Sequence, residues 1–383
     1  MRRGRQAGLV ALAVLLAAAA VAGSVRWAQA KWLSPSGPVV YIPKTIDPRI
    51  EFWQAARQGV DAAAKELGTE VLTLGTDKEK DIDGQIALVE RAIGMRPKAI
   101  VLSATDYERL VPVAKKIRSA RIPLVIIDSG INGDYALSLI ATDNFEAGRK
   151  VGDALKELLP EGGEVGVVNF IKASSTAIER ENGVLASLRE GRGGLEEGAA
   201  SGIGEQASKG VGRLPGASSI AAAGRVESGS SLGAGSDEGQ VYEIVPTVYS
   251  EGLIDKAYEV TKALLRERPG LAGIAALNEP STVGAARAIE EAGAAGRVKL
   301  VGFDSSTSEI DYLEREVLQA IVVQKPFNMG YLAIKTAMQA YRGRKVDPSI
   351  GTGSVVITKK NMFSRENQKL LFPFLDGSGG GGG

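Results

Sequence analysis

The 383-residue sequence contains no cysteine and no histidine. The lack of cysteine excludes disulfides, thiol catalysis and a lipid anchor on a cysteine. The lack of histidine excludes Ser-His-Asp triads and the usual proton shuttle at neutral pH. Together they exclude metal sites built from Cys or His. Carboxylate or lysine chemistry stays possible, so the composition disfavours an enzyme without excluding one.

Neither sign of charge dominates, since 46 Lys and Arg stand against 45 Asp and Glu. No excess of basic residues indicates a nucleic-acid partner. The phosphate loop G-x-x-x-x-G-K-[ST] is also missing, and the Gly-rich stretch of the chain does not join a strand directly to a helix as a dinucleotide fingerprint would. The sequence therefore predicts no cofactor.

The first 30 residues have the form of an export signal. Basic residues at positions 2, 3 and 5 precede an apolar run over 7–22, and Ala28-Gln29-Ala30 has the small-x-small form of a cleavage site. The apolar run is also close to the minimum length of a membrane span, so an uncleaved membrane anchor remains the alternative. Either way, the sequence predicts that the body of the protein is exported, to the periplasm or the cell surface.

From Val39 onward, short apolar runs alternate with amphipathic stretches, which is typical of βαβ units and a parallel sheet. The expected strands are Val39–Ile42, Glu70–Leu74, Ala99–Leu102, Leu124–Ile127, Leu137–Ile140, Val165–Phe170, Val241–Val245, Leu271–Ala276, Lys299–Phe303, Ala320–Val323 and Ser354–Ile357. The expected helices are Phe52–Leu67, Ile82–Gly94, Tyr107–Ser119, a helix capped by Asp143 or Asn144 that runs to Leu159, Leu253–Arg266, Ser281–Ala292, Ser308–Arg315 and Met329–Tyr341. This length and pattern fit two α/β lobes.

The alternation breaks over 191–240, where Gly, Ser and Ala dominate and no aromatic residue occurs. Such a segment buries too little apolar surface to offset the entropy of ordering it. We predict a flexible insertion here, with a small packed subdomain as the alternative. The Gly-rich end over 376–383 has the composition of a disordered tail.

Polar side chains follow several of the expected strands, at the edge where doubly wound sheets bind ligands. They are Asp128, Asn278, Asp304 and Gln324, and Arg180 follows at the start of the next helix after the strand that ends at Phe170. Carboxylates and amides accept hydrogen bonds from sugar hydroxyls, and arginine donates them in a fork. Each residue alone could instead cap a helix or form hydrogen bonds with the backbone of a loop. Together, these residues indicate one ligand-binding cleft.

Phe52 and Trp53, at the start of the first helix, offer flat apolar faces for the C–H surface of a sugar ring. Taken alone, such residues are more often part of the core. A glycosidase with Asp128 and Asp304 as acid and base is a remote alternative. Against it, no residue is evidently placed to hold a raised pKa.

Several blocks of the sequence resemble, in order, the motifs of type I periplasmic sugar-binding proteins, the ribose-binding-protein-like receptors of ABC transporters. The blocks are FWQAARQGVDAAAKELG, IPLVIIDSG, ATDNFEAG, TAIERENG, IAALNEPSTVGAARAI, KLVGFDSS and VVQKPFNMGYLAIKTA. Lac-repressor-type regulators share the fold but carry an N-terminal helix-turn-helix, where this chain has an export segment.

This resemblance implies two doubly wound parallel-sheet lobes joined by three hinge crossovers, with a sugar cleft between them. It implies an N-terminal lobe of 37–142 and 325–353 and a C-terminal lobe of 143–324 and 354–375. It also implies the ligand contacts, which are Phe52, Trp53, Asp128, Arg180, Asn278, Asp304 and Gln324, with Lys44 as a weaker candidate.

The sequence departs from the family pattern at three places. Ser129 stands where ribose-binding members have a second Arg, and IDPRIEFW lacks the usual Asn-Pro before the aromatics. The insertion falls near the position of a further family aromatic, for which Tyr249 is a candidate. These departures leave the identity of the sugar open.

The function implied is a non-enzymatic, monomeric receptor that captures a monosaccharide outside the membrane and delivers it to an ABC permease. The alternative is a membrane-tethered sugar sensor that presents its ligand to a histidine kinase.

Overall fold

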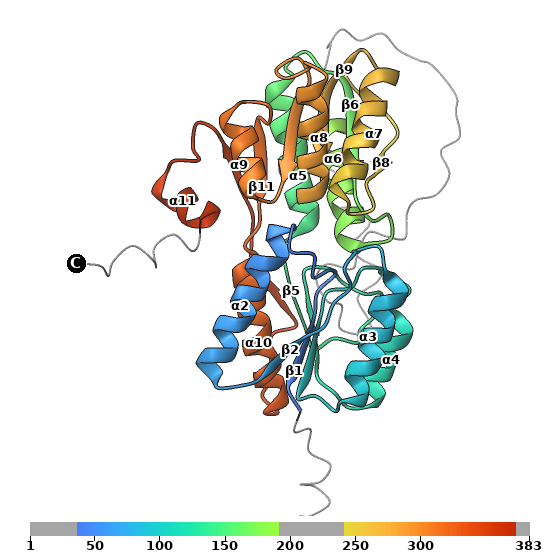
Figure 1. The fold of residues 1–383 in the computed structure, drawn as a ribbon, viewed down its shortest axis with the longest axis vertical. Coiled ribbons are helices and arrows are strands. Elements are labelled where there is room, and N and C mark those ends of the chain that lie inside the picture. Colours follow the sequence, from blue (N-terminus) through green and yellow to red (C-terminus); the bar gives the residue numbers. More distant parts are fainter. Residues whose placement is uncertain (1–36, 191–240, 373–383) are drawn as a thin grey trace, which may run out of the picture.

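The computed structural model describes residues 37–190 and 241–372, which form two α/β lobes stacked along the long axis of the molecule (Figure 1). The export segment 1–30, the insertion 191–240 and the tail 376–383 that the sequence predicts lie outside the described residues.

The first lobe is built on a six-stranded sheet with the order β12-β5-β4-β3-β1-β2. All of its strand pairs are parallel. The strands are β1 (Val39–Ile42), β2 (Val71–Thr73), β3 (Ala99–Leu102), β4 (Leu124–Ile127), β5 (Ser138–Ala141) and β12 (Ser349–Gly351). β1, β3 and β4 are buried along their whole length, which explains their continuous apolar runs.

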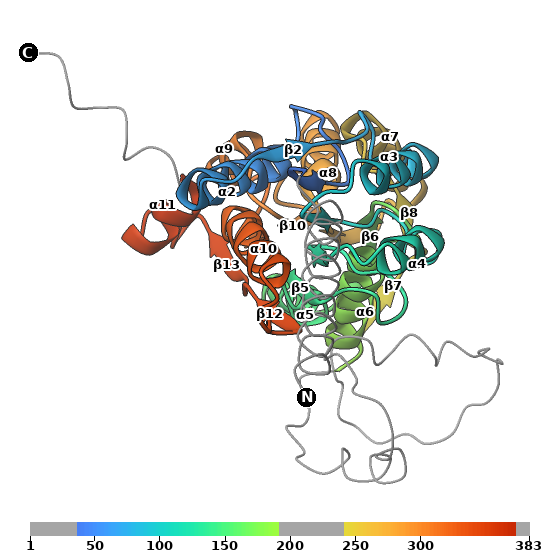
Figure 2. The same cartoon turned by 90° about the horizontal axis from the view of Figure 1, so that it is seen from below.

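Helices cover both faces of this sheet (Figure 2). The helices α2 (Glu51–Leu67) and α10 (Pro326–Tyr341) lie side by side on one face, and α3 (Ile82–Gly94) and α4 (Val111–Ser119) lie on the other. α2 and α10 touch backbone to backbone, because a Cβ on Gly59 would lie 2.0 Å from the carbonyl oxygen of Phe327. This contact ties the start of α10, and with it the connection from the other lobe, to α2.

The second lobe is built on a seven-stranded sheet with the order β13-β11-β10-β9-β6-β7, in which β8 also pairs with β6. Its strands are β6 (Gly163–Asn169), β7 (Tyr242–Ile244), β8 (Val248–Tyr249), β9 (Leu271–Ala276), β10 (Lys299–Phe303), β11 (Ala320–Val323) and β13 (Val355–Thr358). The edge strand β13 is antiparallel to β11, unlike the other pairs of this sheet.

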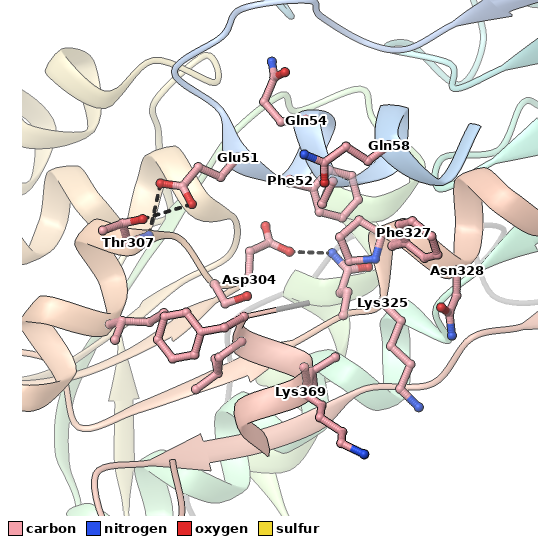
Figure 3. Close-up of a pocket in the computed structure, with 18 of the residues that line it drawn as sticks. Glu51, Phe52, Gln54, Gln58, Asp304, Thr307, Lys325, Phe327, Asn328 and Lys369 are labelled. Atoms are coloured by element: carbon pink, nitrogen blue, oxygen red, sulfur yellow. Dashed lines mark hydrogen bonds between the residues drawn. The ribbon is translucent and has the colours of Figure 1, made fainter. Parts of the chain in front are cut away.

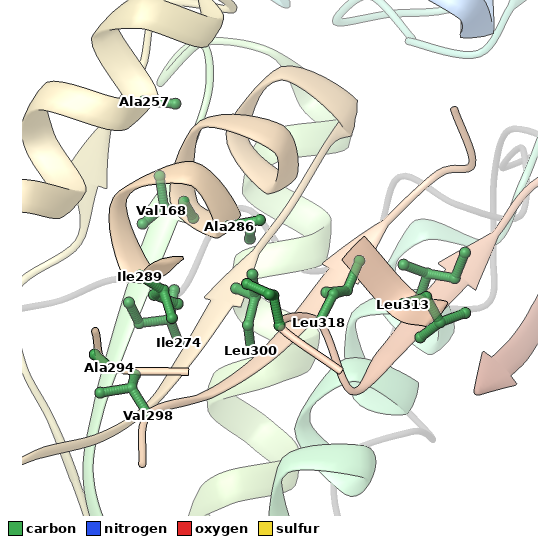
Figure 4. Packing of buried hydrophobic residues seen from close by; sticks show 14 of the residues in the cluster. Val168, Ala257, Ile274, Ala286, Ile289, Ala294, Val298, Leu300, Leu313 and Leu318 are labelled. Atoms are coloured by element: carbon green, nitrogen blue, oxygen red, sulfur yellow. The ribbon is translucent and has the colours of Figure 1, made fainter. Parts of the chain in front are cut away.

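Two helices, α5 (Asn144–Leu158) and α6 (Ser175–Arg189), cover one face of the second sheet, and α7 (Ile254–Glu267), α8 (Glu279–Glu291) and α9 (Thr307–Glu314) cover the other. The apolar layer under α8 and α9 contains Ile274, Leu300 and Leu313, all buried (Figure 4). A last helix, α11 (Arg365–Leu371), follows β13 and projects from the side of this lobe (Figure 1).

The chain crosses between the lobes after β5, after β11 and after β12. The predicted fold of two doubly wound parallel-sheet lobes joined by three crossovers is therefore confirmed. The antiparallel β13 is the departure from an all-parallel arrangement, and a sequence pattern of alternating elements cannot show strand direction at an edge.

Most predicted elements match to within two residues at either end, but three helices begin elsewhere. α6 begins at Ser175, so Arg180 lies inside this helix and not at its start as predicted. α4 begins at Val111 and not at Tyr107, because Asp106 accepts hydrogen bonds from the N–H groups of Glu108 and Arg109 and forms a turn first. α10 begins at Pro326, three residues before the predicted Met329, since proline suits the first helical position. The short β8, β12 and α11 were not predicted.

Candidate functional site

Two aspartates occupy corresponding positions at the ends of strands in the two lobes. Asp128 directly follows β4 and Asp304 directly follows β10, and both have a left-handed backbone, with φ of 61° and 83°. Aspartate is one of the few residues other than glycine that tolerates this region. In each case the backbone N–H still pairs with the neighbouring strand, and the side chain lines the cavity between the lobes.

In the first lobe, Lys44 lies at the centre of a buried cluster of charges. Its ammonium is 3.1 Å from Asp128 Oδ2 and 3.6 Å from Glu79 Oε1. The same ammonium donates across the cleft to the hydroxyls of Ser174 and Thr176, at 3.1 and 3.0 Å. Lys44 is thus committed to protein partners, and it fixes the position of Asp128.

In the second lobe, Arg180 is fully buried in α6. Its Nε donates to Asn144 Oδ1 at 2.9 Å and its Nη1 donates to the carbonyl of Leu277 at 2.8 Å, while its guanidinium stacks 3.8 Å above the Phe303 ring. The remaining nitrogen, Nη2, lies 4.0 Å from Asp128 Oδ1 across the cleft. A sugar hydroxyl between these two atoms could accept from Arg180 and donate to Asp128.

Asp304 and Gln324 form a pair at the ends of neighbouring strands. Asp304 accepts from the N–H of Glu279 at 3.0 Å and from the amide nitrogen of Gln324 at 2.7 Å. Gln324 Oε1 is buried and has no partner among the described residues, which makes it an available acceptor. Asn278 caps α8 by accepting from the N–H of Ser281 at 3.0 Å, so its carbonyl oxygen has the structural role that a strand-end amide commonly takes.

Three aromatic rings from both lobes face the same space. Phe52 and Trp53 meet edge to face with their centroids 4.9 Å apart, and Phe170 directly follows β6 in the other lobe. Tyr249, the candidate for a further aromatic, donates instead to Glu181 and does not line the site. Phe170 is the third aromatic ring that lines the cavity.

All eight residues proposed from the sequence line one cavity between the lobes. They are Lys44, Phe52, Trp53, Asp128, Arg180, Asn278, Asp304 and Gln324. The other residues that line this cavity were not predicted from the sequence, and they are Ile50, Glu79, Phe170, Thr176, Glu279 and Pro280. The cavity has a volume of about 30 Å³, which is roughly that of one water molecule. A monosaccharide cannot enter without separation of the lobes.

The lobes are held together by carboxylates that cap helices across the cleft. α2 begins after Ile50 without a side-chain cap, and Glu279 of the second lobe accepts from the N–H groups of Glu51 and Phe52, each at 2.9 Å. In return, Glu51 accepts from the N–H of Thr307 in the first turn of α9, at 3.1 Å. Both caps place carboxyl oxygens, which accept hydrogen bonds, at the positive end of a helix dipole. They stabilise the closed arrangement of the lobes.

Burial in this closed cleft shifts several carboxyl groups toward the neutral form. Loss of hydration raises the pKa of Glu279 to about 8, although two backbone N–H groups oppose the shift. Burial also raises the pKa of Glu79 against the attraction of Lys44, and the pKa of Asp304 against the attraction of Arg180. The expectation that no group would have a raised pKa was therefore wrong, because burial between two lobes cannot be read from one strand end.

Within 37–190 and 241–372, no group of three or more carboxylates could hold a metal ion. No helix of that part of the chain has the length and apolar character to cross a membrane.

Two lobes that close over a cavity lined by hydrogen-bonding groups and rings define a binding protein for small polar molecules. The family model described as a periplasmic binding protein domain matches residues 39–214 and 230–345. The chain belongs to this family, and the resemblance seen in the sequence is confirmed.

The relatives are sugar-binding proteins. A D-ribose/D-allose-binding protein of Pseudomonas aeruginosa is 26% identical over 302 residues, covering 77% of this chain and 79% of that protein. A solute-binding protein of an ABC transporter from Agrobacterium vitis, solved with bound D-fucose, is 28% identical with a TM-score of 0.73, covering 88% of this chain and 100% of that one. A sugar transporter structure from Clostridium phytofermentans is 32% identical with a TM-score of 0.67, covering 85% of this chain and 100% of that one.

Proposed function

We propose that this protein binds a monosaccharide between its lobes, outside the cytoplasm, and delivers it to the permease of an ABC transporter. The observation that carries the proposal is the convergence of acceptors, a guanidinium and three aromatic rings from both lobes on one cavity. Two of the relatives named above are a ribose- and allose-binding protein and a protein solved with bound fucose, and these sugars are neutral and rich in hydroxyl groups.

The division of the binding residues between the two lobes explains how the protein captures a sugar. Asp128 belongs to the first lobe and Arg180 to the second, so a sugar that bonds to both does so only when the lobes are close together. A ligand with more contacts in the closed state shifts the population toward that state. A permease can then distinguish the closed, sugar-loaded form of the protein from the open form.

The site gives little support to sugar hydrolysis. Both oxygens of Asp304 accept from protein groups, and Asp128 lies against the ammonium of Lys44. A general acid needs a proton within reach of the leaving oxygen and a base on the other side of the ring. We therefore propose that the protein acts as a monomeric receptor and turns over no sugar.

Trp53 should report sugar binding directly. It is the only tryptophan among the described residues, and it lines the cavity beside Phe52. A sugar that packs against it replaces water and neighbouring side chains around the indole, so its emission should shift when a matching pentose, hexose or inositol is titrated. The measurement is fluorescence across such a panel.

The Trp53→Phe variant keeps an aromatic face and should lose the shift while it still binds the sugar by calorimetry. Glycerol, which has no ring, serves as the control ligand and should leave the emission unchanged. A panel in which no monosaccharide alters either the fluorescence or the calorimetric heat would contradict the proposed function.

Sugar affinity should fall as the pH rises toward about 8. In an open, hydrated cleft the pKa of Glu279 returns toward its ordinary value of 4.5, whereas in the closed cleft it is about 8. At a pH between these two pKa values, closure of the cleft takes up a proton on Glu279. The contribution of Glu279 to closure is therefore fully present below the lower pKa and is lost as the pH rises through the higher pKa. One coupled proton corresponds to a change of up to about tenfold in affinity per pH unit.

Calorimetry from about pH 6 to about pH 9 measures this dependence. Glu279→Gln removes one titrating group and should flatten the curve, with the remainder due to Glu79 and Asp304, whose pKa values shift in the same direction. An affinity that rises with pH in the unmodified protein would show that closure releases protons, and the account of these carboxyl groups would be wrong.

A further inference from the structure

A second, larger cavity lies beside the cleft at the hinge (Figure 3). Its volume is about 550 Å³, within the range of roughly 300–1,000 Å³ that holds small organic ligands. Its walls come from α2, from the connection between β11 and α10, from the start of α9 and from α11. We call this cavity the outer pocket.

The outer pocket is separated from the cleft by side chains that line both. These are Phe52, Asp304 and Gln324. Phe52 stands on α2 of the first lobe, Asp304 follows β10 of the second, and Gln324 lies in the connection between the lobes. When the lobes separate, Phe52 moves away from Asp304, so a ligand that holds them apart leaves a passage from the cleft to the outer pocket.

The wall of the outer pocket carries the groups that recognise a sugar ring. The amides of Gln58 and Asn328 have no hydrogen-bond partner within the described ranges, and Figure 3 shows Gln58 above Phe52 and near Phe327. The buried Gln324 Oε1, also without a partner there, lies at the boundary with the cleft. Amides exchange hydrogen bonds with hydroxyls, and an aromatic ring packs against the C–H face of a pyranose.

We propose that the outer pocket is a second sugar subsite, so that the full ligand of this protein is a disaccharide with one ring in the cleft and the other against Phe327 and Gln58. This inference rests on the proposed function, since the first ring occupies the monosaccharide site. The second ring adds contacts in the same binding event, so the disaccharide binds more tightly than either of its constituent monosaccharides.

The experiment is calorimetric titration with neutral reducing disaccharides and, separately, with their constituent monosaccharides. The expected result is a disaccharide that binds at least about tenfold more tightly than either constituent. Phe327→Ala and Gln58→Ala should each remove most of that advantage and leave monosaccharide affinity unchanged. Arg57→Ala, on the same helix and outside both cavities, is the matched control and should change neither affinity.

Gln58 is exposed, so its variant tests the inference even if Phe327→Ala proves unstable. A monosaccharide that binds while every disaccharide containing it binds more weakly would overturn the inference and leave the proposed function intact. Equal losses of monosaccharide and disaccharide affinity in the two variants would overturn it as well. Failure of every sugar of either kind to bind would instead contradict the proposed function, and the inference with it.

Discussion

Replacing Asp128 with asparagine is expected to weaken sugar binding about ten- to a hundredfold. The carboxylate is the acceptor between Lys44 and Arg180, and a hydrogen bond to a charged group contributes roughly 1.5–3 kcal/mol. Asparagine is the informative substitution because it keeps the shape of the side chain and tolerates the left-handed backbone, whose φ is 61°. Calorimetry with the tightest monosaccharide measures the loss.

Asp134→Asn is the matched control, since Asp134 is exposed in the same lobe and its carboxylate has no partner in the described part of the chain. It should leave affinity unchanged. The Asp128→Asn protein should also melt at a lower temperature, because the ammonium of Lys44 loses its nearest carboxylate, at 3.1 Å. Unchanged affinity together with a lowered melting temperature would mean that Asp128 is structural.

Replacing Arg180 is expected to cause a loss of similar or greater size. Arg180→Lys keeps the charge but loses the planar fork that bonds Asn144 and Leu277 and holds the guanidinium against Phe303. A flexible ammonium cannot keep these contacts and still present a donor at Nη2, so affinity should fall by at least about tenfold. Arg180→Ala should lose about a hundredfold and also some stability, since two buried acceptors lose their donor.

Arg189→Lys, at the exposed end of the same helix, is the control and should bind the sugar as the unmodified protein does. The lysine variant at position 180 separates the two roles of the arginine. If the Arg180→Lys variant binds the sugar as tightly as the unmodified protein, Arg180 contributes only its positive charge. The planar guanidinium group would then not be needed for binding, contrary to this account.

The strand-end rule explains why the sequence indicated so much of this cavity. Asp128, Asp304 and Gln324 directly follow buried strands, and parallel strands bring their carboxyl ends to one edge of a sheet. Phe170 could have been found in the same way. The sequence pattern placed it inside the strand, whereas β6 ends at Asn169 and Phe170 is the first residue beyond it.

Other members of the site had no local signal. Glu79 lies in the loop between β2 and α3, several residues beyond its strand, and reaches Lys44 only in the folded lobe. Glu279 looked like an ordinary first-turn acid, and its partners on α2 come from the other lobe. Contacts that exist only after two lobes dock are invisible to periodicity and spacing.

The missed elements have a related explanation. β12 is short and mostly exposed, and it joins the first sheet only because the chain crosses back from the second lobe. β8 has two residues and pairs with β6 beyond the end of β7. Neither segment has a run of apolar residues long enough to predict a strand, since their stability comes from a neighbour that is distant in the sequence.

The most direct measurement is a crystal structure of the protein grown with the monosaccharide that binds most tightly. The account predicts a sugar ring between Phe52, Trp53 and Phe170, with hydroxyl groups hydrogen-bonded to Asp128 and Arg180. The cavity should be larger than the volume of about 30 Å³ in the present structure, while Glu279 still accepts from the N–H groups of Glu51 and Phe52 and so stays buried between the lobes. A sugar found outside this cleft, or one that leaves both Asp128 and Arg180 without a contact, would contradict the account.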